Sequence, residues 1–354
     1  MATTIHNIPS GTVPSCQIPE IRVTGDPPLR IGIARDDTTI FDESFNAGAV
    51  TLYELREIIE SDMRSTGSAE RTYSLATASP SGVASAGISV LFSREIPSGN
   101  LQSDLQSRFL TPALTRRIPS DASLTLWLYA DEEPETPRFT VTFLHDDGSL
   151  GTAVPALSPG YAGNGSRLWR LSLSMAAILR AMPVPYTAIT SVAVNVGERF
   201  AGFIIDPEME ARPPLELTFR NAHNLPDKIY LPAMVTRKVS HSFSEAQTGG
   251  RLTAYDHELT EEYEVKSASL THREALLAAQ LVESRDVYVG AIWPPQRGAT
   301  AVPCLVSDAK CETGSYDTKP PAVSFTLRIA TPARYVPSAA SPGIFTEPFD
   351  PTYM

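Results

Sequence analysis

Proline and glycine recur along the whole chain, and this limits the possible folds more than any other feature of the sequence. The 354 residues include 30 prolines and 21 glycines. Proline inside a helix removes a hydrogen bond and clashes with the preceding turn, whereas both residue types are favoured in turns. The sequence therefore argues against a bundle of long helices and predicts a mainly β protein built from short strands.

The chain is long enough for several domains, each with its own core. Hydrophobic residues make up 42% of the sequence and charged residues 19%, which is typical of globular rather than disordered proteins. We predict a multidomain protein of β-sandwich domains with one or two flanking helices and extended, proline-rich terminal arms. The predicted units are an N-terminal arm (1–20), a small ββαββ-like domain (21–95), a β-sandwich (96–212), a second β-sandwich with a flanking helix (213–335) and a C-terminal arm (336–354).

The first domain is predicted from two strand pairs that flank a helix. Alternating apolar residues indicate strands at 29–33 and 40–45, and further strands are expected at 73–77 and 88–92. Thr51 and Glu54 have the spacing of a capping box, which predicts a helix start at Thr51. The expected apolar face of that helix consists of Leu52, Leu55, Ile58 and Ile59.

The two predicted sandwiches follow from strand-like alternation. In the first, the expected strands lie at 124–129, 139–143, 168–173, 192–196 and 200–205, with a short helix near 175–179. In the second, strands are expected at 215–219 and 323–329, and Gly249-Gly250 is the expected tip of a hairpin.

A single clear helix is predicted inside the second sandwich. Thr271 and Glu274 form a second capping-box pattern, and a strand is expected to start at Val287. The residues expected to face the core are Ala275, Leu276, Ala279 and Val282.

The two terminal segments are predicted to be extended. Pro9, Pro14 and Pro19 punctuate the first, and repeated prolines exclude a helix or a central strand from the second. The C-terminal arm nevertheless carries large apolar side chains, which suit the pockets of a partner. The candidate interaction residues are Ile344, Phe345, Phe349 and Tyr353. The sequence is equally consistent with an arm that folds back onto its own domain.

No catalytic, cofactor or metal signature is present. The adjacent acids Asp36-Asp37 and Asp146-Asp147 occur in turn-like contexts, and the acidic run 131–135 lacks the spacing of a calcium loop. The six histidines are scattered without a metal-binding spacing. We therefore expect a protein that is not an enzyme and that needs no cofactor.

Cysteine content and hydropathy favour folding in a reducing compartment. Cys16, Cys304 and Cys311 are too few for a disulfide framework, and whether Cys304 and Cys311 pair is left open. No apolar run is long enough for a transmembrane helix, and the first residues do not have the pattern of a secretory signal.

The charge pattern argues against binding to nucleic acid. The net charge is −11 and no basic patch is evident. Arginine outnumbers lysine 24 to 5, which suits protein interfaces but is also expected from a coding bias.

Three sets of segments carry a family resemblance: 40–45 with 50–59; 108–111 with 117–119; and 217–221, 235–238, 263–265 and 284–288. Together they resemble uncharacterised tail and baseplate structural proteins of tailed phages and prophages of anaerobic gut bacteria. The resemblance spans most of residues 25–330 but rests on framework residues. At the level of pattern, 213–335 is also similar to tail-tube and distal-tail sandwiches.

This resemblance implies a structural virion protein, a ring-forming tail or baseplate component that acts by assembly. Its expected partners are further copies of itself in a ring and neighbouring virion proteins, without sequence-specific nucleic-acid binding and without a membrane. The expected location is the virion, after synthesis in the host cytoplasm. The alternative is a carbohydrate-binding or adhesin module of a phage or cell surface, in which Trp127, Trp169, Trp293 and Tyr161 would form a stacking platform. A hydrolase of the envelope is the third hypothesis, and no nucleophile–base set supports it.

Overall fold

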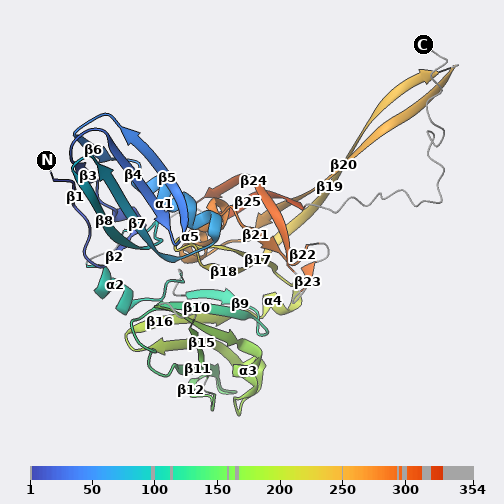
Figure 1. Ribbon diagram of the computed structural model, residues 1–354. Helices are drawn as coiled ribbons and strands as arrows, with labels where there is room; N and C mark the ends of the chain where they lie inside the picture. Colours follow the sequence, from blue (N-terminus) through green and yellow to red (C-terminus); the bar gives the residue numbers. More distant parts are fainter. Residues whose placement is uncertain are drawn as a thin grey trace.

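The computed structural model consists of three β-rich lobes that meet near the centre of the molecule (Figure 1). The structure describes residues 2–96, 100–111, 115–157, 159–163, 167–248, 250–292, 295–296, 301–312 and 320–329. From the N-terminus, the lobes are called domain 1, domain 2 and domain 3. The chain is mainly β, as the sequence predicts.

Domain 1 contains two sheets and one helix around a shared core. The sheets have the orders β1-β3-β6 and β2-β8-β7-β4-β5. The expected order of two strands, a helix and two strands occurs as β4, β5, α1, β7 and β8, but β6 lies between β5 and α1, and β1, β2 and β3 precede β4. The elements are β1 (Thr4–His6), β2 (Thr12–Pro14), η1 (Ser15–Gln17), β3 (Ile21–Thr24), β4 (Leu29–Arg35), β5 (Thr38–Phe45), β6 (Ala49–Leu52), α1 (Leu55–Thr66), β7 (Glu70–Ser79) and β8 (Gly82–Leu91).

The first twenty residues belong to domain 1 rather than to a separate arm. Strand β1 pairs with β3, and β2 pairs in parallel with β8. Both are edge strands, the positions that a proline-rich segment tolerates, because proline has no N–H to donate and an edge strand has one side without a neighbour.

The predicted capping box at Thr51 is wrong. Thr51 lies in β6, where it pairs with Arg22 of β3, and the helix begins at Leu55 without a side-chain cap. Pairing with β3 places Leu52 in the core as a strand residue, so tertiary contacts override the local signal. Helix α1 ends at Gly67, whose φ of 65° is the left-handed conformation that glycine adopts easily.

Domain 2 is a β-sandwich. Its two sheets have the orders β10-β14-β13 and β12-β11-β15-β16-β9. The elements are α2 (Leu101–Ser107), β9 (Thr115–Ile118), β10 (Ser123–Tyr129), β11 (Arg138–Leu144), β12 (Leu150–Ala153), β13 (Tyr161–Gly163), β14 (Leu168–Ser174), α3 (Met175–Arg180), η2 (Tyr186–Ala188), β15 (Ile189–Val196), β16 (Arg199–Ile205) and α4 (Glu208–Ala211).

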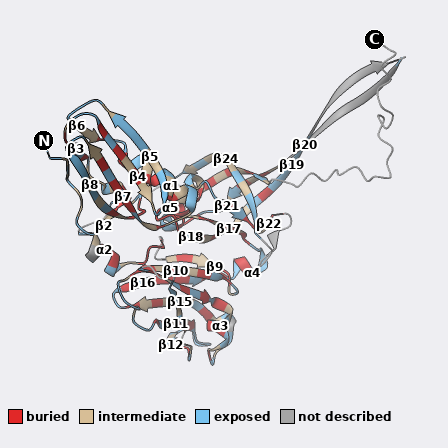
Figure 2. Ribbon diagram, in the orientation of Figure 1, coloured by how far each residue is buried: buried red, intermediate tan, exposed pale blue. Residues whose placement is uncertain are grey.

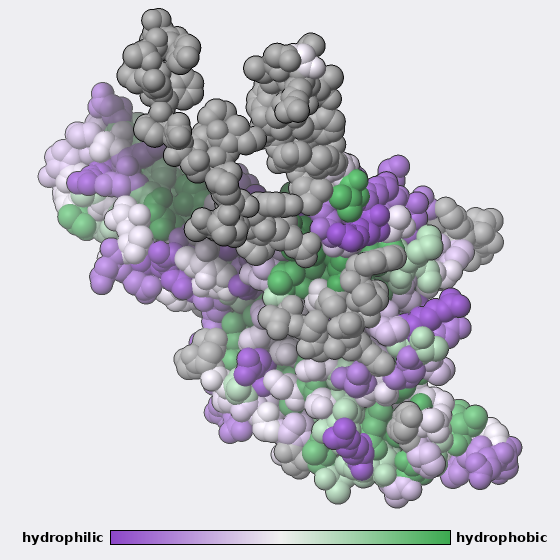
Figure 3. All heavy atoms as spheres, turned by 90° about the vertical axis from the view of Figure 1, so that its right-hand side faces the viewer, coloured by the Kyte–Doolittle hydropathy of each residue, from purple (hydrophilic) through white to green (hydrophobic). Residues whose placement is uncertain are grey.

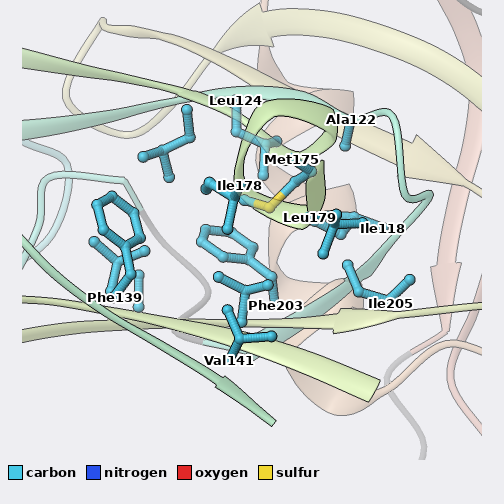
Figure 4. Packing of buried hydrophobic residues seen from close by; sticks show 14 of the residues in the cluster. Ile118, Ala122, Leu124, Phe139, Val141, Met175, Ile178, Leu179, Phe203 and Ile205 are labelled. Atoms are coloured by element: carbon cyan, nitrogen blue, oxygen red, sulfur yellow. The ribbon is translucent and has the colours of Figure 1, made fainter. Parts of the chain in front are cut away.

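The core of domain 2 is closed at one end by helix α3. Met175, Ile178 and Leu179 of α3 point toward side chains of both sheets, Leu124 of the three-stranded sheet and Phe139 and Phe203 of the five-stranded sheet (Figure 4). Ser174 starts the helix by accepting a hydrogen bond from the backbone N–H of Ala177. The sequence predicts this short helix within a few residues.

Domain 3 is built on one seven-stranded antiparallel sheet rather than on two separate sheets. The strand order is β18-β17-β21-β24-β25-β20-β19. Only Pro232 separates the end of β18 from the start of β19, so the two edge strands adjoin there and the sheet curves around its core. The elements are β17 (Leu215–Arg220), β18 (Pro226–Leu231), β19 (Ala233–Thr248), β20 (Arg251–Ser267), α5 (His272–Glu283), β21 (Val287–Val289), β22 (Ala291–Ile292), β23 (Pro295–Gln296), β24 (Val302–Glu312) and β25 (Ala322–Ile329).

Helix α5 covers this core, and its capping box is confirmed. Thr271 Oγ1 accepts from the Glu274 N–H at 3.2 Å, and Glu274 Oε2 accepts from the Thr271 N–H at 2.8 Å. The predicted apolar face is partly wrong, because Leu276 is 50% exposed whereas Leu277 is fully buried. The helix is turned so that Glu274 and Leu277 face inward, since Glu274 binds a residue of domain 2.

Strands β19 and β20 continue far beyond the sheet as a hairpin, which projects from the molecule in Figure 1. Strand β20 pairs with β25 only from Glu262 to Lys266. Beyond that point β19 and β20 pair with each other, from Val239 with Glu261 to Thr248 with Arg251. The second pair encloses the predicted tip, of which Gly249 lies outside the described residues. At about 3.3 Å per residue the free part is roughly 30 Å long.

A candidate site at the junction of the three domains

The turn between β17 and β18, residues 220–225, lies where the three domains meet. Buried residues of all three domains, including Leu91, Leu110 and Leu225, form one apolar cluster beside it. Figure 2 shows that buried residues continue through this central region. The Asn221 side chain holds the turn by accepting from the N–H groups of His223 and Leu225.

The same turn stabilises the C-terminal end of helix α1. Asn224, at a φ of 56°, donates through Nδ2 to the carbonyls of Met63 and Ser68, both at 2.9 Å. Arg220 Nη1 donates to the Gly67 carbonyl at 3.1 Å. These bonds give a further donor to the Met63 carbonyl, which also accepts from the Ser68 N–H, and partners to the Gly67 and Ser68 carbonyls just past the helix. A Cβ at Gly67 would lie 2.6 Å from Arg220 Nη2, so both the backbone angle and the close approach require glycine there.

Two ion pairs join domain 2 to domain 3. Arg117 of β9 binds Glu274 of α5 through Nε at 3.0 Å and Nη2 at 2.9 Å. Burial raises the pKa of Glu274, but hydrogen bonds from Arg117 and from the Thr271 N–H outweigh it, and the pKa lies below its usual value. Arg116 binds Asp227 at 3.2 Å, and both side chains are almost fully buried.

A cavity of about 450 Å³ opens beside this junction and is rich in arginine. Its walls come from the end of α1, from 92–95, from 220–224 and from the end of α5 with the residues that follow it. The four arginines that line it are Arg64, Arg94, Arg220 and Arg285.

Three of these arginines have carboxylate partners. Arg64 binds Glu60, Arg94 binds Glu283 at 3.2 Å, and Arg220 binds Asp286 at 3.0 Å. Arg64 also lies over the Phe92 ring, with its Cζ 5.4 Å from the ring centre. Burial and then the positive charge of Arg94 lower the pKa of Arg64, with further lowering from Arg285 and Arg56. The lining thus carries four arginines against three carboxylates, Glu95, Glu283 and Asp286, in a chain whose net charge is −11.

A buried histidine lies next to the cavity wall. His223 is 2% exposed, and its Nδ1 lies 3.3 Å from the Phe92 carbonyl. Burial lowers the pKa of His223. This position favours a neutral imidazole that packs between domains 1 and 3.

The candidate residues from the sequence lie elsewhere. Ile344, Phe345, Phe349 and Tyr353 lie outside the described residues, so the docking of the C-terminal arm stays a prediction. Asp36-Asp37 and Asp146-Asp147 both lie in turns, as predicted, and Asp147 accepts from the Ser149 N–H at 2.9 Å. Cys304 and Cys311 are both free thiols that donate to different carbonyls, and burial raises the pKa of Cys304 to about 12.

The aromatic platform of the carbohydrate-binding alternative does not form from Trp127 and Trp169. Trp127 pairs with Arg170, whereas Trp169 pairs with Leu128, so the two indoles lie on opposite faces of one sheet. Their Nε1 atoms donate to the carbonyls of Pro226 and Ala130. Trp293 lies outside the described residues.

Sequence patterns did not identify the junction. Arg220, Asn221 and Asn224 form an ordinary polar turn, and Arg64, Arg94 and Arg285 are far apart in the sequence. The only available signal was the run 220–225, which has two asparagines between alternating strands. Within the described part of the chain, no group of three or more His, Cys, Asp or Glu residues could hold a metal ion, and no helix has the length and hydropathy to span a membrane.

Among the known proteins compared with this chain, only solved structures match it. No family model and no curated protein matches the chain. A structure of titin domains Z1Z2 in complex with telethonin is 16% identical and covers 58% of this chain and 97% of that chain, with a TM-score of 0.19. The titin Ig tandem A164–A165 is 12% identical, and the match covers 53% of this chain and 88% of that chain, with a TM-score of 0.22. The titin I-band fragment I67–I69 is 13% identical, and the match covers 76% of this chain and 95% of that chain, with a TM-score of 0.19. At TM-scores this low, the likeness carries no argument about function.

Proposed function

We propose that this chain is a structural virion protein of a tailed phage, a ring-forming tail or baseplate component that acts by assembly with further copies of itself. The sequence resemblance given above supports this class. The observation that carries the proposal is the projecting hairpin formed by β19 and β20.

An isolated two-stranded hairpin is at best marginally stable in water. Both of its edges also present backbone N–H and C=O groups that a neighbouring chain can pair with. From Arg251 to Glu261, β20 pairs with β19 alone among the described strands. A second copy of the chain would supply the missing contacts and make the hairpin part of a continuous structure.

The base of the hairpin is packed firmly into domain 3, so the hairpin would hold a neighbouring copy at a fixed position relative to this domain. Val235 and Val265 are buried in the core of domain 3. Arg237 binds Glu261 at 2.7 Å, and Arg328 binds Glu262 just before the strands leave the sheet. On the side of the molecule that faces the viewer in Figure 3, hydrophobic and hydrophilic surfaces lie beside each other. An interface between subunits is on average about as apolar as the rest of a protein surface, so a surface of this kind can serve as one.

The decisive experiment shortens the hairpin without touching its base. Replacing 240–260 by Asn-Gly joins Val239 to Glu261 through a two-residue turn of the type that closes hairpins. Electron microscopy and analytical ultracentrifugation should show closed rings for the unchanged chain and only monomers for the shortened one. The unfolding temperature of the shortened chain should stay within about 5 °C of that of the unchanged chain, because the free hairpin contributes little to the cores.

A matched control introduces the same turn elsewhere. Gly197 and Glu198 form the two-residue loop between β15 and β16, and the double substitution Gly197→Asn, Glu198→Gly should leave assembly intact. Normal rings from the shortened chain would remove the hairpin from the mechanism. An unchanged chain that stays monomeric at every concentration would refute the proposed function.

A further inference from the structure

We propose that the arginine-lined cavity between domains 1 and 3 is a binding site for a small multivalent oxyanion, a ligand with several phosphate or carboxylate groups. This inference does not depend on assembly into rings. It rests on the donors that face the cavity, on the balance of charge around it and on its size.

Two of the four arginines keep unused hydrogen-bond donors. The Arg64 Nε is buried without a hydrogen-bond partner, while its Nη2 binds Glu60. Arg285 is exposed and makes no ion pair with any described residue. A guanidinium carries five N–H donors in a planar fork, a geometry that suits phosphate and carboxylate groups.

The carboxylates that line the cavity number one fewer than its arginines: Glu283 and Asp286 bind Arg94 and Arg220, and Glu95 is the third. Glu95 lines the cavity but binds Arg108 at 2.5 Å, on the side of domain 2. Glu60 is shared between Arg64 and Arg56. The lowered pKa of Arg64 is consistent with this, because the charges of Arg94, Arg285 and Arg56 act on it besides its burial.

The size of the cavity selects a small ligand. A volume of about 450 Å³ lies within the range of about 300–1,000 Å³ that is usual for small-molecule sites. Arg64 comes from domain 1 and Arg285 from domain 3, so one ligand would contact both domains. It would thereby stabilise the junction by binding the folded chain alone.

The test is calorimetric titration of the full chain with pyrophosphate and, separately, with citrate at low ionic strength. Binding should weaken at least tenfold in Arg285→Gln, which is exposed and cannot disturb folding, and in Arg64→Gln. The control Arg170→Gln removes an equal charge from an exposed strand residue of domain 2 and should bind as the unchanged chain does.

The two titrants also distinguish phosphate from carboxylate ligands. Equal weakening in all three variants, or no binding of either anion, would overturn the proposal and leave the arginines as partners of the C-terminal ends of α1 and α5. Binding of a peptide with the acidic sequence 129–137, but of neither small anion, would overturn it in favour of a loop from a second copy.

Discussion

At the scale of single residues, the least satisfied contact among the described residues is the buried pair of Arg116 and Asp227. Arg116 Nη1 donates to Asp227 Oδ1 and to the Lys228 carbonyl, but Arg116 Nε and Nη2 and Asp227 Oδ2 have no partner. Burial raises the pKa of Asp227, against the opposing effect of Arg116. Such geometry offsets only part of the free-energy cost of removing two charges from water.

Removing one charge of this pair should therefore cost more than removing both. We expect Arg116→Met to lower the free energy of unfolding by about 3–5 kcal/mol, because the buried Asp227 carboxyl loses its opposite charge and keeps the Lys228 N–H as a donor. The double variant Arg116→Met, Asp227→Leu should recover more than half of that loss. Urea denaturation measures both values. A double variant as unstable as the single one would show that the pair is net stabilising.

At the scale of elements, helix α5 shows what a local pattern specifies and what it leaves open. Its capping box fixes where the helix begins, because both hydrogen bonds form among residues three apart. The rotation of the helix is fixed by its neighbours, since α5 contacts β17, β24 and β25 as well as β9 of domain 2. For this reason the expected inward position of Leu276 was wrong.

Two neighbouring leucines of α5 provide a test with a built-in control. Leu277→Ala should lower the free energy of unfolding by about 2–5 kcal/mol, because it leaves a cavity in a packed core. Leu276→Ala, at a side chain that is 50% exposed, should cost less than about 1 kcal/mol. Chemical denaturation of both variants checks the assignment, and similar losses would mean that the helix is turned differently.

At the scale of the whole molecule, the junction determines whether the domains act as one rigid block. Arg117 and Glu274 link the edge strand of domain 2 to the helix of domain 3, with further hydrogen bonds from Arg117 to Ser269 and from Arg273 to Thr115. Because hydrogen bonds hold the pKa of Glu274 below its value of 4.5 in the unfolded chain, its ionised form favours the folded state. That contribution is complete above about pH 5 and disappears as the pH falls through the folded-state pKa.

The junction should accordingly weaken in acid. We expect Glu274→Gln to lower the unfolding temperature at pH 7, and we expect its difference from the unchanged chain to shrink as the pH falls below 4.5. Thermal unfolding monitored between pH 3 and pH 7 measures this. Glu57→Gln, the same substitution at an exposed residue of α1, is the matched control for the change of side chain itself. A difference that stays constant across the range would mean that the charge of Glu274 does not stabilise the junction.

The sequence by itself determined many of the longer strands, the capped start of α5 and the turns at Asp36-Asp37 and Asp146-Asp147, because these features depend on residues close together along the chain. Tertiary structure decided the rest. The N-terminal segment joined domain 1 because β3 and β8 offered it edges, and Thr51 became a strand residue because β3 paired with it. The arginine cavity came from residues as distant as Arg64 and Arg285, which no local pattern relates. Pairing between distant segments depends on packing and charge in three dimensions, so only the folded chain fixes it.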